Sequence, residues 1–135
     1  MPAKYKVVER VNPADRLAPR KFYPSLQSNG RANQRTLALE AADRSSVSDA
    51  DIAATLANLL ALIPKHLAMG EVVDLGDFGT FRLTISGEGS DTAELVTSRN
   101  IKKVGVRFTP GPIFEEALAQ IHFEKVAAEK TTTTE

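Results

Sequence analysis

The chain has 135 residues, 42% of them hydrophobic, which is enough for one modest core and too few for two ordinary domains. It contains no cysteine, which excludes disulfides, zinc–thiolate sites and thiol nucleophiles. The 17 basic and 17 acidic residues cancel, yet residues 1–35 hold eight basic side chains against Glu9 and Asp15, a balance of +6, so the remainder carries −6. A basic segment of this kind is typical of an arm that meets a polyanion, and equally of solvated lysines on an edge strand.

Two strands are predicted in residues 1–30. In residues 4–11 apolar and basic side chains alternate with the period of a half-buried strand. The apolar set is Tyr5, Val7 and Val11, and the basic set is Lys4, Lys6 and Arg10. A second alternating run covers residues 21–27, and Pro24 makes it an edge strand because proline cannot donate to a central ladder. We expect residues 1–30 to form a basic, strand-like extension.

Two helices follow. The first is short and covers residues 33–45. The second begins at Ser48, a plausible N-cap with Asp51 three residues later, and ends at Gly70. Its apolar side chains recur every three or four residues, which predicts a core-facing stripe, and Pro64 predicts a kink. The stripe consists of Ile52, Leu56, Leu59, Leu60, Ile63 and Leu67.

The remaining elements are strands and one helix. Residues 71–75 and 78–85 are predicted as strands joined by a two-residue turn at Gly76-Asp77, and residues 104–108 as a later strand. Ser90 or Asp91 is suited to cap one helical turn between them. A last helix opens at residues 109–112, and residues 126–135 are predicted to be a disordered tail. The expected buried face of this helix is Ile113, Ala117, Leu118 and Ile121.

The order of these elements resembles the HU and integration-host-factor family of bacterial DNA-bending proteins. The matching stretches are VSDADIAATLANLLALIPKHLAMGEVVDLGDFGTF at 47–81 and VRFTPGPIFEEAL at 106–118. The resemblance implies an HU-like domain over residues 31–125 with an added N-terminal β segment. It also implies an α+β fold in which two chains intertwine, with a helical base and an antiparallel sheet saddle that carries two arms. In this homodimer the expected core residues are Leu56, Leu60, Ile63, Phe78, Phe81 and Phe108.

The arm of this chain departs from the family pattern. Members of the family carry basic arms with an Arg-Asn-Pro tip whose proline inserts between base pairs. Here residues 86–96 hold Glu88, Asp91 and Glu94 and no Lys, Arg or Pro. Ile101 follows an Arg-Asn pair, and either packs on its neighbours, which we favour, or serves as an apolar wedge in the minor groove. We therefore expect weak bending in place of a sharp kink.

The candidate DNA-binding residues are basic side chains near the sheet and in the extension. Contacts from such residues to phosphate give affinity without sequence information, and a solvated sheet face would show the same pattern. The amides of residues 111–114 could add a phosphate contact at a helix start. The candidates are Arg82, Arg99, Lys102, Lys103 and Arg107, together with Lys4, Lys6, Lys21, Arg31 and Arg35.

No enzyme class fits the sequence. Asp77-Phe78-Gly79 spells a kinase magnesium motif but lacks the rest of that machinery, and His66 and His122 have no metal-ligand partner at helical spacing. We expect no catalytic residue, metal, cofactor or small-molecule substrate, and no secretion signal or membrane span. The prediction is a cytoplasmic, nucleoid-associated homodimer that binds double-stranded DNA without sequence specificity. The alternative is an HU scaffold that dimerises but has lost DNA binding, which the net neutrality and the acidic arm favour.

Overall fold

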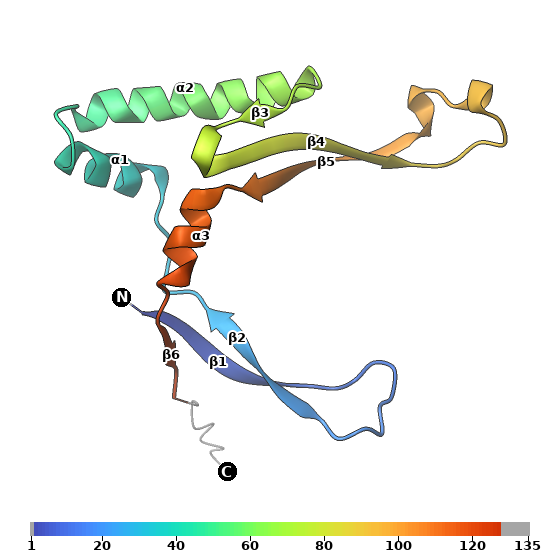
Figure 1. Ribbon diagram of the computed structural model, residues 1–135, viewed down its shortest axis with the longest axis horizontal. Helices are drawn as coiled ribbons and strands as arrows, with labels where there is room; N and C mark the ends of the chain where they lie inside the picture. Colours follow the sequence, from blue (N-terminus) through green and yellow to red (C-terminus); the bar gives the residue numbers. More distant parts are fainter. Residues whose placement is uncertain (1, 128–135) are drawn as a thin grey trace, which may run out of the picture. The chain divides into compact units, whose positions relative to one another are not determined.

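The computed structural model describes residues 2–127, and the chain divides into two units that are described separately. One unit holds the residues up to Ala32 together with those from Ala119 onward, and the other holds Asn33–Leu118. Across the described residues the architecture is α+β, with three α-helices and two three-stranded sheets (Figure 1).

The N-terminal sheet consists of β1 (Ala3–Arg10), β2 (Lys21–Gln27) and β6 (Phe123–Lys125), in the order β2-β1-β6. β1 and β2 are antiparallel, from Lys4 opposite Gln27 to Arg10 opposite Lys21. The two predicted strands are confirmed. β2 lies at the edge of the sheet, as expected from Pro24.

β6 has no counterpart among the predicted strands, because three residues are too few for a periodic pattern. It runs parallel to β1, and the amide of Ala3 donates to the carbonyl of His122 at 2.9 Å. Val126, expected in the disordered tail, donates its amide to the carbonyl of Tyr5 at 2.9 Å, which corrects that expectation at this residue. Residues 128–135 of the expected tail lie outside the described residues.

The second unit begins with α1 (Gln34–Asp43) and α2 (Asp49–Ala68). Asn33 Oδ1 accepts a hydrogen bond from the Thr36 amide at 2.9 Å, and Ser48 Oγ accepts one from the Asp51 amide at 3.2 Å. The predicted cap at Ser48 is therefore confirmed. α2 continues as one helix through Pro64, the position where we expect a kink.

α2 ends at Ala68 and is terminated by Gly70, as predicted. Gly70 has a φ of +82°, which side chains other than glycine rarely adopt. Its amide donates to the carbonyl of Leu67 at 2.9 Å, and the Glu71 amide donates to the carbonyl of His66 at 3.2 Å. These two bonds form a Schellman motif, which satisfies the last carbonyls of the helix.

The second sheet consists of β3 (Val73–Asp74), β4 (Gly79–Gly87) and β5 (Ile101–Pro110), in the order β3-β4-β5. The expected two-residue turn is wrong: a 3₁₀ turn over Gly76–Phe78 joins β3 to β4, so Phe78 precedes the strand. Gly79 follows with a φ of +139°, and a side chain there would collide with the carbonyl oxygen of Thr109. The close approach of β4 and β5 at this point requires glycine.

β4 and β5 form a long ribbon that ends in an irregular tip, residues 88–100 (Figure 1). The tip contains two 3₁₀ turns, Ala93–Leu95 and Ser98–Asn100. The expected cap by Ser90 or Asp91 is wrong, because Thr92 precedes the first turn and makes no side-chain cap bond. Ser90 instead accepts a hydrogen bond from Asn100 Nδ2 at 2.9 Å, which closes the tip.

Four phenylalanines meet where β4, β5 and α3 (Pro112–Ala119) join. The ring centroids of Phe81 and Phe108 are 4.6 Å apart, and those of Phe78 and Phe114 are 5.1 Å apart. Aromatic pairs at these distances stabilise beyond their buried area. The cluster fixes the base of the ribbon.

Few apolar side chains are buried. Among the described residues the buried hydrophobics are Ala38 and Leu67. The α2 stripe and one face of α3 were expected to be buried, yet Leu60 is 44% exposed and Leu118 is 59% exposed. For the single chain the expectation for α3 is wrong, and the expectation for α2 holds at Leu67 but not at Leu59 and Leu60. One helix pair and one three-stranded sheet cannot cover every apolar face they carry.

Candidate nucleic-acid interface

The ribbon of β4 and β5 has one polar face and one apolar face. Its register places Arg82 opposite Arg107 and Ser86 opposite Lys103. Because side chains alternate along a strand, these residues share a face with Thr84 and Gly105. The apolar face carries the cross-strand pairs Phe81 with Phe108, Leu83 with Val106, and Ile85 with Val104. Within β4 and β5 the polar face thus has three cations and no acid, and the neighbouring strand β3 adds Asp74, opposite Thr80, to the same face of the sheet.

Arg82 and Arg107 form an unusual pair, because like charges directly opposite in a ladder destabilise a sheet. Neither guanidinium has a carboxylate partner: the ion pairs within the described residues are Arg20 with Glu9 and His66 with Glu71. A bound anion between the two strands would relieve their repulsion. The next pair on this face is Thr84 opposite Gly105. Because neither residue has a large side chain, a phosphate group could approach the strand backbone beside the two arginines.

Only three of the five candidate DNA-binding residues near the second sheet lie on the polar face of the ribbon. Arg82, Lys103 and Arg107 lie on the polar face. Lys102 falls at an irregularity, because Ser86 pairs with Lys103 while Gly87 pairs with Ile101 and Lys102 has no partner. Arg99 lies in the last 3₁₀ turn of the tip, beyond the end of the regular ladder.

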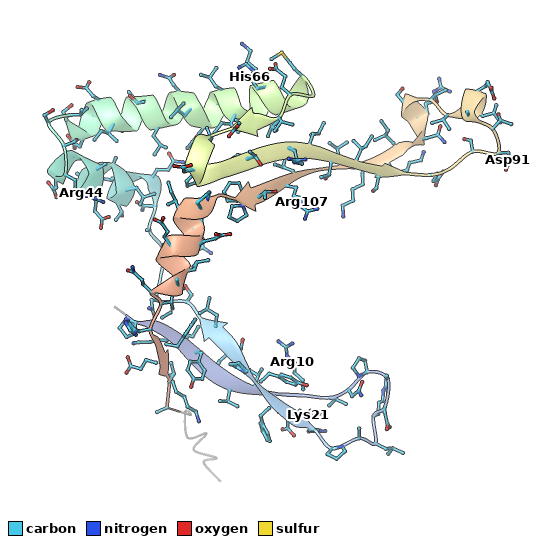
Figure 2. All side chains as sticks on the ribbon, viewed as in Figure 1. Arg10, Lys21, Arg44, His66, Asp91 and Arg107 are labelled. Atoms are coloured by element: carbon cyan, nitrogen blue, oxygen red, sulfur yellow. The ribbon has the colours of Figure 1, made fainter. Side chains whose placement is uncertain are left out.

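Acidic side chains occupy the two ends of the ribbon. Glu88, Asp91 and Glu94 lie in the exposed tip, and Figure 2 shows Asp91 at the far end, away from Arg107. At the other end Asp74 lies opposite Thr80, and its Oδ1 accepts a hydrogen bond from the Gly76 amide at 2.8 Å. Asp74 therefore caps the turn between β3 and β4.

The start of α3 is poorly suited to phosphate. The Gly111 amide donates to the carbonyl of Phe78 at 2.9 Å, and the Phe114 amide donates to the carbonyl of Gly111 at 3.1 Å. Pro112 has no amide hydrogen. The expected phosphate contact from residues 111–114 is therefore not supported by this geometry.

The extension candidates Lys4, Lys6 and Lys21 share one face of the N-terminal sheet. Arg10 lies on the same face, directly opposite Lys21. Arg10 is not among the DNA-binding residues predicted from the sequence. The pattern that could have identified it is its even spacing from Lys4, which places both side chains on one face of the strand. The other two candidates lie elsewhere: Arg31 in the segment before α1 and Arg35 on α1.

The predicted dimer residues are exposed or half-buried in the single chain. Leu60 and Phe78 are exposed, while Leu56 and Ile63 on α2 are half-buried. Phe81 and Phe108 are also half-buried and belong to the phenylalanine cluster.

No group of three or more His, Cys, Asp or Glu side chains that could hold a metal occurs in the described part of the chain. His66 Nδ1 lies 3.3 Å from Glu71 Oε1, an exposed contact at the end of α2. None of the described helices is long and apolar enough to cross a membrane.

A capped helix pair followed by a ribbon with one basic face and an aromatic base defines an HU-like domain. The chain belongs to the HU-HIG family, described as an HU domain fused to a wHTH, Ig or glycine-rich motif, and the family model matches residues 1–125. The resemblance to HU proteins is thereby confirmed, and the N-terminal sheet lies within the matched range.

A solved structure of a candidate bacterial DNA-binding protein from Bacteroides vulgatus has a similar fold. It matches with a TM-score of 0.62 and 14% identity, over 91% of this chain and 48% of that one. This chain therefore spans about half the length of that protein. No curated protein matches the chain.

Proposed function

We propose that this protein binds double-stranded DNA without sequence preference, through phosphate contacts made by a homodimer. The observation that carries the proposal is the unpartnered Arg82–Arg107 pair on the polar face of the ribbon, with Lys103 beside it. Guanidinium groups bind phosphate oxygens with two parallel hydrogen bonds, and such contacts carry no base information. The family and the similar solved structure support the same reading.

The dimer would cover the apolar faces that the single chain leaves open. Leu59 and Leu60 on α2 are 48% and 44% exposed, and exposed patches of this kind mark association surfaces. A second copy packed on α2 would bury them with Leu56, Ile63 and the phenylalanine cluster. Light scattering should then give twice the chain mass, and Leu60→Asp should shift the protein toward a monomer. A wild-type monomer mass would refute this assembly.

Bending should be weak. The tip of the ribbon carries Glu88, Asp91 and Glu94, and its backbone is folded into two 3₁₀ turns. Phosphate repels these carboxylates, and the tip has no proline to insert between bases. Energy transfer between dyes at the two ends of a duplex should therefore change little on binding.

Fluorescence anisotropy with a labelled duplex of about 30 base pairs tests the binding. A dimer that doubles Arg82, Lys103 and Arg107 makes six phosphate contacts, so affinity should fall by roughly 10³ between about 50 and 200 mM salt. The double variant Arg82→Ala/Arg107→Ala should bind much more weakly and show a shallower salt dependence. Arg44→Ala/Lys65→Ala, which removes two cations at the ends of α1 and α2, is the matched control (Figure 2 labels Arg44).

The competing function is that of a dimeric scaffold without DNA binding. The acidic tip favours it, because it replaces the basic arm of HU proteins. Failure of the wild-type protein to bind duplex at about 50 mM salt would support this scaffold and reject the DNA-binding proposal.

A further inference from the structure

The N-terminal sheet is chemically two-sided. One face is apolar, with Tyr5 opposite Leu26 and Val7 opposite Pro24. The other face is basic and carries Lys4, Lys6, Arg10 and Lys21, with Val8 opposite Tyr23 among them. The acidic residues nearby are few: Glu9 points to the apolar side and lies 3.8 Å from Arg20, and Glu124 lies opposite Lys4 at the β6 edge.

The basic face of the N-terminal sheet, like the ribbon of the second unit, has two cations directly opposite each other on paired strands. Arg10 lies directly opposite Lys21, as Arg82 lies opposite Arg107. None of the four is in an ion pair among the described residues. Two separate antiparallel ladders thus hold a repelling pair of cations, and an anionic ligand would relieve each pair.

An aromatic ring lies beside the N-terminal pair. The Arg10 guanidinium carbon lies 5.8 Å from the centroid of the Tyr23 ring, within the range of a cation–π contact. This contact holds the guanidinium over the sheet, and Tyr23 remains 42% exposed. A cation fixed next to an exposed aromatic ring is suited to a nucleic-acid backbone and the sugars and bases beside it.

Protection of a sheet edge explains only part of this arrangement. Lysines that prevent aggregation are needed on edge strands, where backbone groups are unpaired. β2 is an edge strand, and β6 pairs only with Ala3–Tyr5, so β1 is also an edge strand at Lys6 and Arg10. Edge protection does not require two cations directly opposite each other, as Arg10 and Lys21 are.

We propose that the basic face of the N-terminal sheet is a second duplex-contact surface, centred on Arg10, Lys21 and Tyr23. This inference rests on the proposed DNA binding and assigns part of the affinity to a separate sheet. The ligand is the phosphate backbone of a duplex.

Charge removal provides the first test. Arg10→Ala/Lys21→Ala should weaken binding to the duplex of about 30 base pairs at least about fivefold and lower the salt slope by about 1.8 for each chain bound, since each phosphate contact contributes about 0.9. The matched control Arg44→Ala/Lys65→Ala removes the same charge from the ends of α1 and α2, which are not part of the N-terminal sheet, and its affinity should stay within about twofold of wild type. Equal losses in the two double variants would overturn the proposal.

Tyrosine fluorescence gives a second readout that does not depend on affinity. The chain has two tyrosines and no tryptophan, and the structure places Tyr5 on the apolar face and Tyr23 on the basic face. Tyr5→Phe leaves Tyr23 as the emitter, and its emission, corrected for absorption by DNA, should be quenched as duplex is added. Tyr23→Phe leaves Tyr5, whose emission should not change.

The two proposals fail in different ways. If anisotropy shows wild-type binding while Tyr23 emission stays constant, the second surface is wrong and the DNA-binding function stands. If wild-type protein does not bind duplex at about 50 mM salt, both are wrong. Circular dichroism melts of each variant separate lost contacts from lost folding.

Discussion

Replacing Arg107 by Gln should move affinity and stability in opposite directions. The substitution keeps a long polar side chain on β5 and removes the charge that faces Arg82. If Arg107 binds phosphate, duplex affinity falls. If its main interaction within the free protein is repulsion by Arg82, the free energy of unfolding rises.

The size of the stability gain follows from the register. Directly opposed residues have Cβ atoms about 5 Å apart, and long side chains spread their charges to roughly 7 Å, where Coulomb repulsion in water is about 0.6 kcal/mol. A gain of about 0.3 to 0.6 kcal/mol is therefore expected at low salt. It should vanish near 1 M salt, where the screening length is about 3 Å.

Urea unfolding measures this gain, with the protein concentration held constant because dimer stability depends on it. Anisotropy with the duplex of about 30 base pairs measures the affinity in parallel. A loss of stability of more than about 1 kcal/mol would refute the reasoning, since it would show that Arg107 stabilises the fold by hydrogen bonds or packing. Arg44→Gln is the matched control, with no opposed cation and no expected gain.

Further variants test the fold and the acidic tip. Gly79→Ala should destabilise by roughly 2 kcal/mol or more in urea unfolding, because it strains a left-handed φ and collides with the facing strand. Ser48→Ala should cost about 1 kcal/mol in the same assay through loss of the α2 cap. Neutralising the tip with Glu88→Gln, Asp91→Asn and Glu94→Gln should strengthen duplex binding severalfold at about 10 mM salt and little at 150 mM.

Local chemistry made some elements predictable from the sequence. Ser48 signals its helix start by a side-chain oxygen placed to accept from the amide three residues later, and the cap needs no tertiary information. The alternation in β1 and β2 likewise predicts the two faces of the N-terminal sheet before its partners are known. Family resemblance then gave the class of domain, which the match over residues 1–125 confirms.

Features that depend on distant partners could not be predicted. β6 has only three residues, and it pairs with β1, where Phe123 lies opposite Ala3, a residue remote in the sequence. The tip is closed by hydrogen bonds from Asn100 to Ser90 and to the carbonyl of Glu88, and no local pattern announces them. The exposure of Leu60 depends on the number of layers in the single chain, which periodicity does not report.

The neutrality of the chain and its acidic tip are compatible with a DNA-binding ribbon because the charges are separated. Arg82 and the end of β4 at Gly87 are five residues apart, which at about 3.3 Å per residue is roughly 17 Å. The screening length is about 8 Å at physiological salt, so the carboxylates beyond Gly87 scarcely weaken the field at the arginine pair. At about 0.01 M salt the length grows to about 30 Å, and the tip then opposes binding. The acidic tip would therefore act mainly on DNA that reaches it, limiting contact to the base of the ribbon.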